Sequence, residues 1–156
     1  MSRAFVREED FETPEALPER PISEHRNLVT ESGLKQIEAQ IDDLQARLAQ
    51  ADDSEKPFIT RDLRYWQARR ETAELVMSPG DCAQVRFGCW VTIEDEEGKQ
   101  SRFRIVGEDE ADPTQGLIFY RAPLARLLIG KRGGEEAEFR GHQYEIIEIG
   151  LSKSMA

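Results

Sequence analysis

The stretch that decides the fold is residues 33–75, GLKQIEAQIDDLQARLAQADDSEKPFITRDLRYWQARRETAEL. Its first part places apolar side chains three or four residues apart, at Leu34, Ile37, Ile41, Leu44 and Leu48. On a helix these positions form one narrow stripe of the coiled-coil type. The stripe stops over residues 51–57 and resumes at Ile59, Leu63, Trp66, Ala73 and Met77, broken only by Arg70. Two stripes separated by a short polar linker predict two helices that fold back on each other as an antiparallel coiled-coil hairpin.

Capping and breaking residues set the expected ends of this hairpin, which we place at residues 30–77. Thr30 suits the N-cap of the first helix, because its hydroxyl can accept a hydrogen bond from a backbone N–H of the opening turn. The first helix should end near Ala51, and Pro57 fits the first turn of the second helix. Residues 78–81, Ser-Pro-Gly-Asp, end the second helix near Met77 and mark a domain boundary at residues 78–82.

The pattern after residue 84 is typical of strands. Alternating or apolar runs separated by turn residues predict strands at 85–87, 90–93, 101–106, 117–120, 136–139 and 144–149. A short helix is expected over 124–129, after Pro123 and before Gly130. We therefore predict an α+β protein, in which the hairpin is followed by an antiparallel sheet domain at 82–151 and a tail at 152–156. Residues 1–29, rich in Glu, Arg and Pro, are expected to form a partly disordered extension.

Composition restricts the function classes. The 156 residues carry a net charge of -10, and an acidic chain without a long Lys/Arg cluster does not favour direct, sequence-specific binding of nucleic acid. Cys82 and Cys89 lack the second pair that a zinc site needs, so we expect reduced, structural cysteines. No apolar run is long enough for a membrane span or a signal sequence, and we expect a cytoplasmic protein. His25 and His142 have no nucleophile at an informative spacing.

Several separate blocks of this sequence resemble the Gre (GreA/GreB) family of bacterial transcription elongation factors. The opening Thr-x-x-Gly-Leu of that family is matched by residues 30–34, TESGL. The other matching blocks are VRFGCWV at 85–91, FRIVGEDEAD at 103–112 and APLARLLIGK at 122–131. The resemblance covers about residues 30–151, and the order and spacing of the blocks make it specific.

The resemblance implies a coiled-coil hairpin followed by a C-terminal domain of FKBP-like fold. In such factors the C-terminal domain docks at the rim of the RNA polymerase secondary channel. The hairpin enters the channel, where acidic tip residues help to hold a catalytic Mg²⁺, and the polymerase then cleaves its own backtracked RNA. Clustered carboxylates suit Mg²⁺, and a metal ion can activate water for phosphodiester hydrolysis. The resemblance implies no cofactor held by the chain alone, and Mg²⁺ only as an ion shared with the polymerase.

The tip and the length of the hairpin depart from the family. The usual tip signature, Gly-Asp-x-x-Glu-Asn-Ala-Glu-Tyr, is absent, and the predicted tip carries Asp52, Asp53 and Glu55 instead. The hairpin is shorter by roughly three turns per helix, which removes on the order of 15 Å of reach. Because Mg²⁺ needs oxygen ligands within about 2.1 Å, a shorter reach argues against stimulation of RNA cleavage.

The predicted docking segment consists of Arg121, Ala122, Pro123 and Leu124. Many family members have an acidic residue or Ser directly before the proline, so the positive charge here could weaken or redirect docking. Pro123 and Leu124 can also serve only to start a helix and fill the core.

The sequence thus predicts an RNA polymerase-binding Gre-like elongation factor that has no enzymatic activity of its own. Two mechanisms stay open: stimulation of transcript cleavage, and occupancy of the channel in competition with longer factors. The alternative is a Rnk-like regulator that acts without RNA cleavage. A prolyl isomerase has only the fold in its favour. We expect a monomer, with a dimer also open because the seam of a two-helix hairpin could pair with a second copy.

Overall fold

A computed structural model describes residues 17–77 and 80–152 of the chain. Residues 1–16 of the predicted extension, residues 78–79 of the predicted boundary and residues 153–156 of the predicted tail lie outside this description. The chain divides into two compact units. One unit contains residues 34–73 with the segment before Asn27, and the other contains residues 27–33 with the chain from Glu74 onward.

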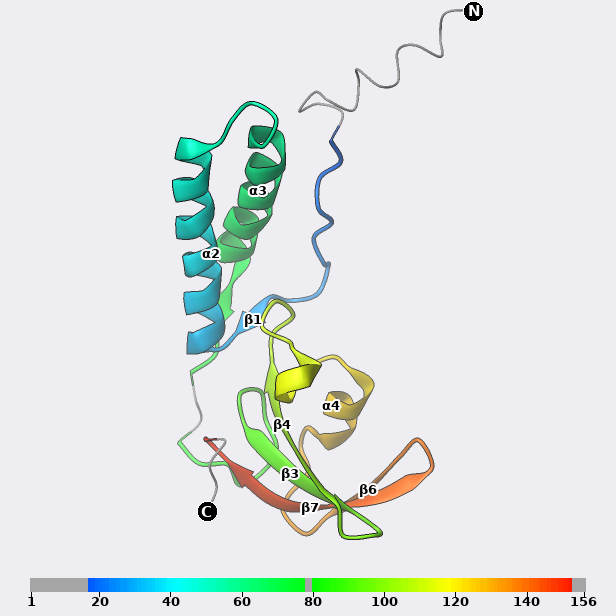
Figure 1. Cartoon of the computed structure of the whole chain (residues 1–156). Helices are drawn as coiled ribbons and strands as arrows, with labels where there is room; N and C mark the ends of the chain where they lie inside the picture. The colour runs from blue at the N-terminus through cyan, green and yellow to red at the C-terminus, as the bar shows by residue number, and fades with distance from the viewer. Residues whose placement is uncertain (1–16, 78–79, 153–156) are drawn as a thin grey trace, which may run out of the picture. The chain divides into compact units, whose positions relative to one another are not determined.

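The predicted helical hairpin is formed by α2 (Glu31–Gln50) and α3 (Lys56–Thr72) (Figure 1), and the first unit contains it from Leu34 onward. Leu44, Ile59 and Leu63 are buried between the helices, and Ile41, Leu48, Ala51 and Trp66 pack around them. The apolar stripe of the sequence therefore forms the helix–helix interface, and each fully buried Leu or Ile contributes roughly 1.5–3 kcal/mol. Arg70, which breaks the stripe, lies exposed, and its Nε stands 3.4 Å from the Glu38 carboxylate.

The predicted end of the second helix near Met77 is wrong. Helix α3 ends at Thr72, Ala73 is extended, and Glu74–Leu75 forms strand β2. This strand pairs in parallel with β1 (Leu28–Val29). The N–H of Glu74 donates to the Asn27 carbonyl at 2.8 Å, and the N–H of Val76 donates to the Val29 carbonyl at 2.9 Å. These strand bonds replace the helical ones that a longer α3 would need.

Within the predicted extension, residues 17–29 make defined contacts, which is compatible with the expectation of an extension that is only partly disordered. Asn27 and Val29 are buried, and residues 28–29 form a strand. Before them, the Arg20 guanidinium lies 3.9 Å from the centroid of the Tyr65 ring. The Arg64 Nε donates to the Glu19 carboxylate at 2.8 Å. Residues 17–26 thus contact α3 through cation–π and ionic interactions.

The second unit is built on a five-stranded sheet with the order β5-β4-β3-β7-β6. Its strands are β3 (Trp90–Asp95), β4 (Gln100–Val106), β5 (Leu117–Phe119), β6 (Glu136–Phe139) and β7 (His142–Gly150). The pairs β3–β4, β3–β7 and β6–β7 are antiparallel. These elements and the hairpin confirm the α+β class.

Two predictions about the sheet are wrong. Strand β5 pairs in parallel with β4, so the sheet is mixed and not antiparallel. The reason is the loop 107–116, which contains the 3₁₀ turn η3 (Pro113–Gln115) and carries the chain back so that Leu117 lies opposite Arg104. Residues 85–87 form no strand, although Val85 is fully buried. There the chain turns at Gly88, with φ of +90°, and the Gly88 N–H donates to Ile105 O at 2.7 Å.

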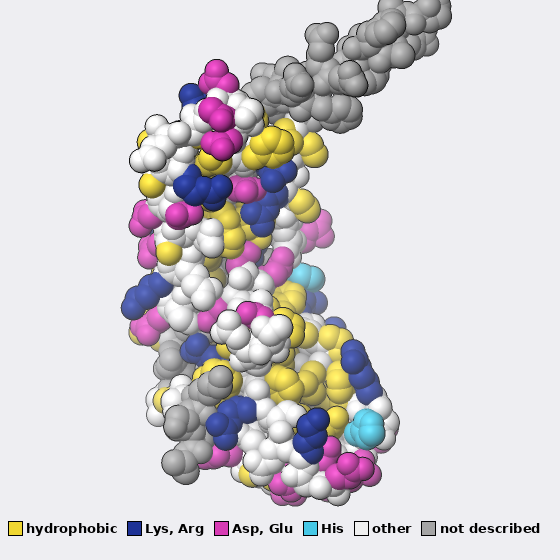
Figure 2. All heavy atoms as spheres, in the orientation of Figure 1, with side chains coloured by type: hydrophobic (Ala, Val, Ile, Leu, Met, Phe, Trp, Pro, Cys, Tyr) yellow, Lys and Arg dark blue, Asp and Glu magenta, His cyan; other side chains and the backbone are white. Residues whose placement is uncertain are grey.

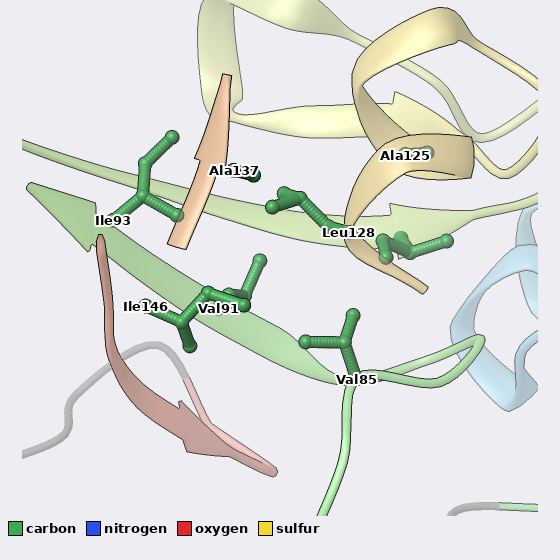
Figure 3. Packing of buried hydrophobic residues seen from close by; sticks show 8 residues of the cluster. Val85, Val91, Ile93, Ala125, Leu128, Ala137 and Ile146 are labelled. Atoms are coloured by element: carbon green, nitrogen blue, oxygen red, sulfur yellow. The ribbon is translucent and has the colours of Figure 1, made fainter. Parts of the chain in front are cut away.

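The short helix α4 (Pro123–Leu128) packs on one face of this sheet and completes the core (Figure 3). The buried cluster contains Val85, Val91, Ile93, Ile105, Ala125, Leu128, Ala137 and Ile146. Val91 and Ile93, alternate residues of β3, belong to this cluster, and Trp90 and Thr92 on the opposite face of the strand are buried as well. In the described part of the chain, no helix has both the length and the apolar character needed to cross a membrane.

Candidate functional site

The loop that joins α2 and α3 carries the three predicted tip carboxylates. Acidic side chains gather at this end of the hairpin in the space-filling view (Figure 2). Oδ1 of Asp52 accepts hydrogen bonds from the Ser54 N–H at 3.0 Å, the Ser54 hydroxyl at 2.6 Å and the Glu55 N–H at 3.0 Å. The Glu55 carboxylate in turn accepts a bond from the Asp52 N–H at 3.4 Å. This reciprocal arrangement is a capping box, which starts the turn leading into α3.

The capping box changes the pKa of one tip carboxylate, that of Asp52. The Ser54 hydroxyl bond, followed by the Glu55 backbone bond, lowers the pKa of Asp52, because both bonds stabilise the ionised carboxylate. The side chain of Asp53 is fully exposed, with one oxygen 3.6 Å from the Lys56 ammonium. Within residues 17–77 and 80–152, no three His, Cys, Asp or Glu side chains converge so that they could hold a metal ion. The three tip residues thus share one loop, but Asp52 acts as a cap within it.

The two helices determine how far the hairpin extends. Helices α2 and α3 contain 20 and 17 residues. At 1.5 Å per residue they measure about 30 and 26 Å.

The predicted docking segment presents two different faces. Ala122 is extended, and Pro123 opens α4, as its fixed φ and missing N–H permit. Arg121 and Pro123 are exposed. Ala122 and Leu124 are half-buried and pack against the core cluster. Leu124 therefore has the core role, while Arg121 and Pro123 are accessible to a partner.

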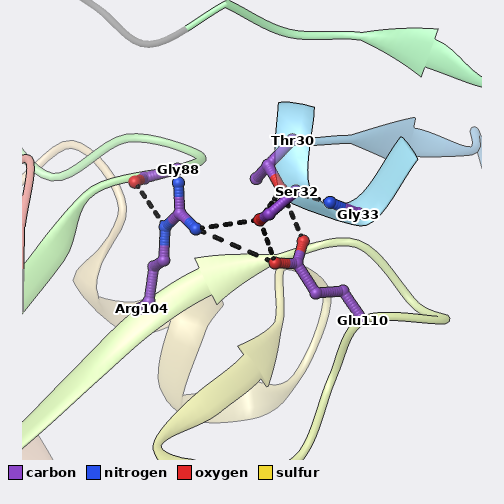
Figure 4. A network of polar contacts seen from close by, with 6 residues as sticks. All are labelled: Thr30, Ser32, Gly33, Gly88, Arg104 and Glu110. Carbon is purple, nitrogen blue, oxygen red and sulfur yellow. Dashed lines mark hydrogen bonds and ion pairs between the residues drawn. The ribbon is translucent and has the colours of Figure 1, made fainter. Parts of the chain in front are cut away.

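A polar network joins three of the sequence blocks on which the family resemblance rests, at residues 30–34, 85–91 and 103–112 (Figure 4). The Thr30 hydroxyl donates to Oε1 of Glu110 at 2.6 Å, and the Ser32 hydroxyl donates to Oε2 at 2.7 Å. The Glu110 side chain is only 4% exposed, and Nη1 of Arg104 lies 3.8 Å from its Oε2. Two hydroxyl bonds and a nearby guanidinium compensate for the burial of this carboxylate.

The same network holds the start of α2. The Gly33 N–H donates to the Thr30 hydroxyl oxygen at 3.0 Å, which confirms Thr30 as the predicted N-cap. Nε of Arg104 donates to the Gly88 carbonyl at 3.0 Å. Space for side chains is small here: a Cβ on Gly33 would lie 2.7 Å from Oε1 of Glu110, and one on Gly107 would lie 2.1 Å from the Leu28 carbonyl oxygen. These contacts identify the loop after β4 as a support for the first turn of α2.

Sequence reasoning found Thr30 and the tip loop but missed the partnership with Glu110. The two residues are 80 positions apart, and no local pattern links them. Both histidines are exposed. Nδ1 of His142 lies 4.0 Å from the Glu96 carboxylate, and the His25 N–H donates to the Ser23 hydroxyl. Neither contact has the geometry of a nucleophile and its base.

The chain thus combines a helical hairpin with a mixed sheet domain, and the sheet domain exposes Arg121 and Pro123 on its surface. The sequence model described as "Transcription elongation factor, GreA/GreB, C-term" matches residues 80–150. Residues 80–150 of this chain are therefore similar to the C-terminal domain of GreA/GreB transcription elongation factors.

Individual relatives are also similar to part of this chain. The chain is 47% identical over 70 residues to transcription elongation factor GreB of Pseudomonas aeruginosa, covering 44% of this chain and 42% of the relative. It is 44% identical over 82 residues to GreA of Verminephrobacter eiseniae, covering 47% and 52%. The chain thus spans about half the length of the curated relatives that it matches.

Two solved structures are similar over a larger share of the chain, at lower identity. GreA factor homolog 1 (Gfh1) of Thermus thermophilus is 17% identical, with 80% of this chain and 99% of that chain covered and a TM-score of 0.39. GreA/GreB from Nitrosomonas europaea is 20% identical, with 80% and 98% covered and a TM-score of 0.41.

Proposed function

We propose that this chain is a Gre-like transcription elongation factor that binds RNA polymerase and acts through the secondary channel, without catalytic activity of its own. The observation that carries the proposal is the GreA/GreB match over residues 80–150, which includes the exposed Arg121 and Pro123. These side chains project from a segment whose neighbours, Ala122 and Leu124, pack on the core, so the surface is held rigidly. Rigid presentation favours binding because little conformational entropy is lost.

Within this function we favour occupancy of the channel over stimulation of RNA cleavage. Helices of 20 and 17 residues give a short hairpin, and the capping box engages Oδ1 of Asp52. Asp53 and Glu55 are the remaining tip carboxylates, and any Mg²⁺ at the tip would have to be shared with the polymerase. In this proposal the chain competes with longer cleavage factors. A Rnk-like regulator would also bind polymerase without promoting cleavage.

A binding measurement with matched charge variants tests the docking part. Bacterial RNA polymerase immobilised on a sensor surface would be exposed to the full chain, to Arg121→Glu and to Lys99→Glu. Both variants change the net charge equally, but Lys99 lies in the exposed turn between β3 and β4, in the same unit. If Arg121 lies in the interface, reversal of its charge should weaken binding on the order of tenfold, while Lys99→Glu binds as the parent does. Absence of binding by the parent chain, or equal effects of the two variants, would contradict the proposal.

A further inference from the structure

The two cysteines lie much closer together than a chance arrangement of thiols. The Sγ atoms of Cys82 and Cys89 are 2.8 Å apart, and both residues are free cysteines. A disulfide bond is about 2.05 Å long, so a movement of under about 1 Å would bring the two sulfur atoms to bonding distance. Both residues belong to the unit that contains the sheet.

The backbone between the two cysteines is anchored at Val85 and at Cys89. The Val85 N–H donates to the Lys131 carbonyl at 2.8 Å, and the Cys89 N–H donates to the Arg86 carbonyl at 3.0 Å. The side chain of Val85 is fully buried in the core cluster. Each of these contacts forms when the domain folds, so the folded chain positions the two thiols before any reaction occurs.

We propose that Cys82 and Cys89 are a modification site, at which a small-molecule disulfide such as glutathione disulfide converts the two thiols into one intramolecular disulfide. Cys82 reacts first, because it is partly accessible whereas Cys89 is completely buried. Its thiolate attacks one sulfur of the reagent, a mixed disulfide forms, and one small thiol leaves. Cys89 then attacks the Cys82 sulfur and displaces the second small thiol.

The reaction balances without a further reactant. Two electrons pass from the protein thiols to the reagent, and the two protons end on the two released small thiols. Burial, followed by the hydrogen bond with Cys89, raises the pKa of Cys82 to about 12. The attacking species is the thiolate, so oxidation at neutral pH is slow and accelerates as the pH rises.

The bond would tie the segment before Val85 to the residue that precedes β3. It closes a ring from residue 82 to residue 89 around the turn at Gly88. This site does not depend on polymerase binding, and the chemistry concerns only this chain and a small disulfide.

Redox titration with peptide mapping tests the proposal. The reduced full chain would be equilibrated with mixtures of reduced and oxidised glutathione, quenched with N-ethylmaleimide and digested with trypsin. Cleavage after Arg86 separates the cysteines into peptides 71–86 and 87–99. We expect these peptides to appear as one linked pair that reductant separates. The glutathione ratio at which half of the chain carries the disulfide gives the effective concentration of one protein thiol at the other. We expect this effective concentration to be at least about tenfold higher in the folded chain than in the chain unfolded by guanidinium.

Two variants separate this mechanism from other thiol chemistry. In Cys89→Ala, Cys82 should stop at the mixed disulfide with glutathione. In Cys82→Ala, the buried Cys89 should stay unmodified in the folded protein. The proposal is wrong if both cysteines remain alkylated at every ratio, if the link forms only between two molecules, or if folding does not raise the effective concentration.

Discussion

The bond between Thr30 and Glu110 gives the most quantitative prediction, because the same chain contains a matched exposed bond. In the buried pair, a hydroxyl donates to a carboxylate at 2.6 Å, and the carboxylate side chain is 4% exposed. In the exposed pair, the Thr114 hydroxyl donates to Asp112, also at 2.6 Å. The distance and the types of donor and acceptor are the same, and the pairs differ in burial, in sequence separation (80 against two positions) and in the other bonds that each carboxylate accepts.

The magnitude follows from the groups lost. Thr30→Val removes one charge-assisted hydrogen bond, worth about 1.5–3 kcal/mol, and one N-cap, worth about 1 kcal/mol, so the free energy of unfolding should fall by about 3 kcal/mol. Glu110→Ala removes the bonds from both Thr30 and Ser32 and should cost about 3–5 kcal/mol. In the double variant the shared bond is lost only once, which predicts a coupling energy of about 2 kcal/mol.

Unfolding of the full chain in urea would be monitored by circular dichroism for the parent and for the single and double variants of both cycles. The exposed cycle, Thr114→Val with Asp112→Ala, should give a coupling energy of no more than about 0.5–1 kcal/mol, because water replaces the lost partner. A coupling energy in the buried cycle as small as that in the exposed one would refute the reasoning that burial of Glu110 makes this network strong.

The further predictions concern three single positions. Gly107→Ala should lower the free energy of unfolding by about 3 kcal/mol, since its Cβ would lie 2.1 Å from a backbone oxygen, whereas Gly133→Ala, with nothing within 4 Å, serves as the control in the same urea assay. Asp52→Ala should lower the thermal midpoint of the hairpin more than Asp52→Asn, which keeps an acceptor oxygen. Because the pKa of Asp52 is lowered from 3.8, the stabilisation by its ionised form is present above that value and is lost as the pH falls through the pKa of the folded protein, which melting curves across acidic pH would detect. The alkylation rate of Cys82 in Cys89→Ala should be far below that of a free thiol at neutral pH if burial, the larger cause of its raised pKa, persists.

Local patterns explain which parts of the fold could be predicted from the sequence. The interface of α2 and α3 was predictable because the stripe from Leu34 to Leu48 has the helical period and lies within one segment. Helix α4 was predictable from Pro123 and the core strands from their alternation, because these signals also lie within a few residues of one another.

The errors arise where distant segments decide the structure. Strand β2 forms at Glu74–Leu75 because β1 supplies its hydrogen-bond partners, and the helical spacing of Ala73 and Met77 carries no information about them. The direction of β5 depends on the path of the loop after β4. In the candidate site, too, local features could be predicted from the sequence and contacts between distant segments could not. The tip loop and Thr30 were visible in the sequence, whereas the burial of Glu110 beneath Thr30 and Ser32 requires the folded chain.

The central claim, that this chain binds polymerase through a GreA/GreB-type domain without promoting cleavage, is tested most directly on backtracked elongation complexes. Complexes with labelled RNA would be incubated with Mg²⁺ and the full chain, or with Asp52→Ala/Asp53→Ala, and binding and RNA length would be measured together. We predict that the parent chain binds, that the RNA keeps its length, and that a longer cleavage factor added afterwards acts more slowly. RNA shortening that disappears with Asp52→Ala/Asp53→Ala, or no binding to the complex, would contradict the account.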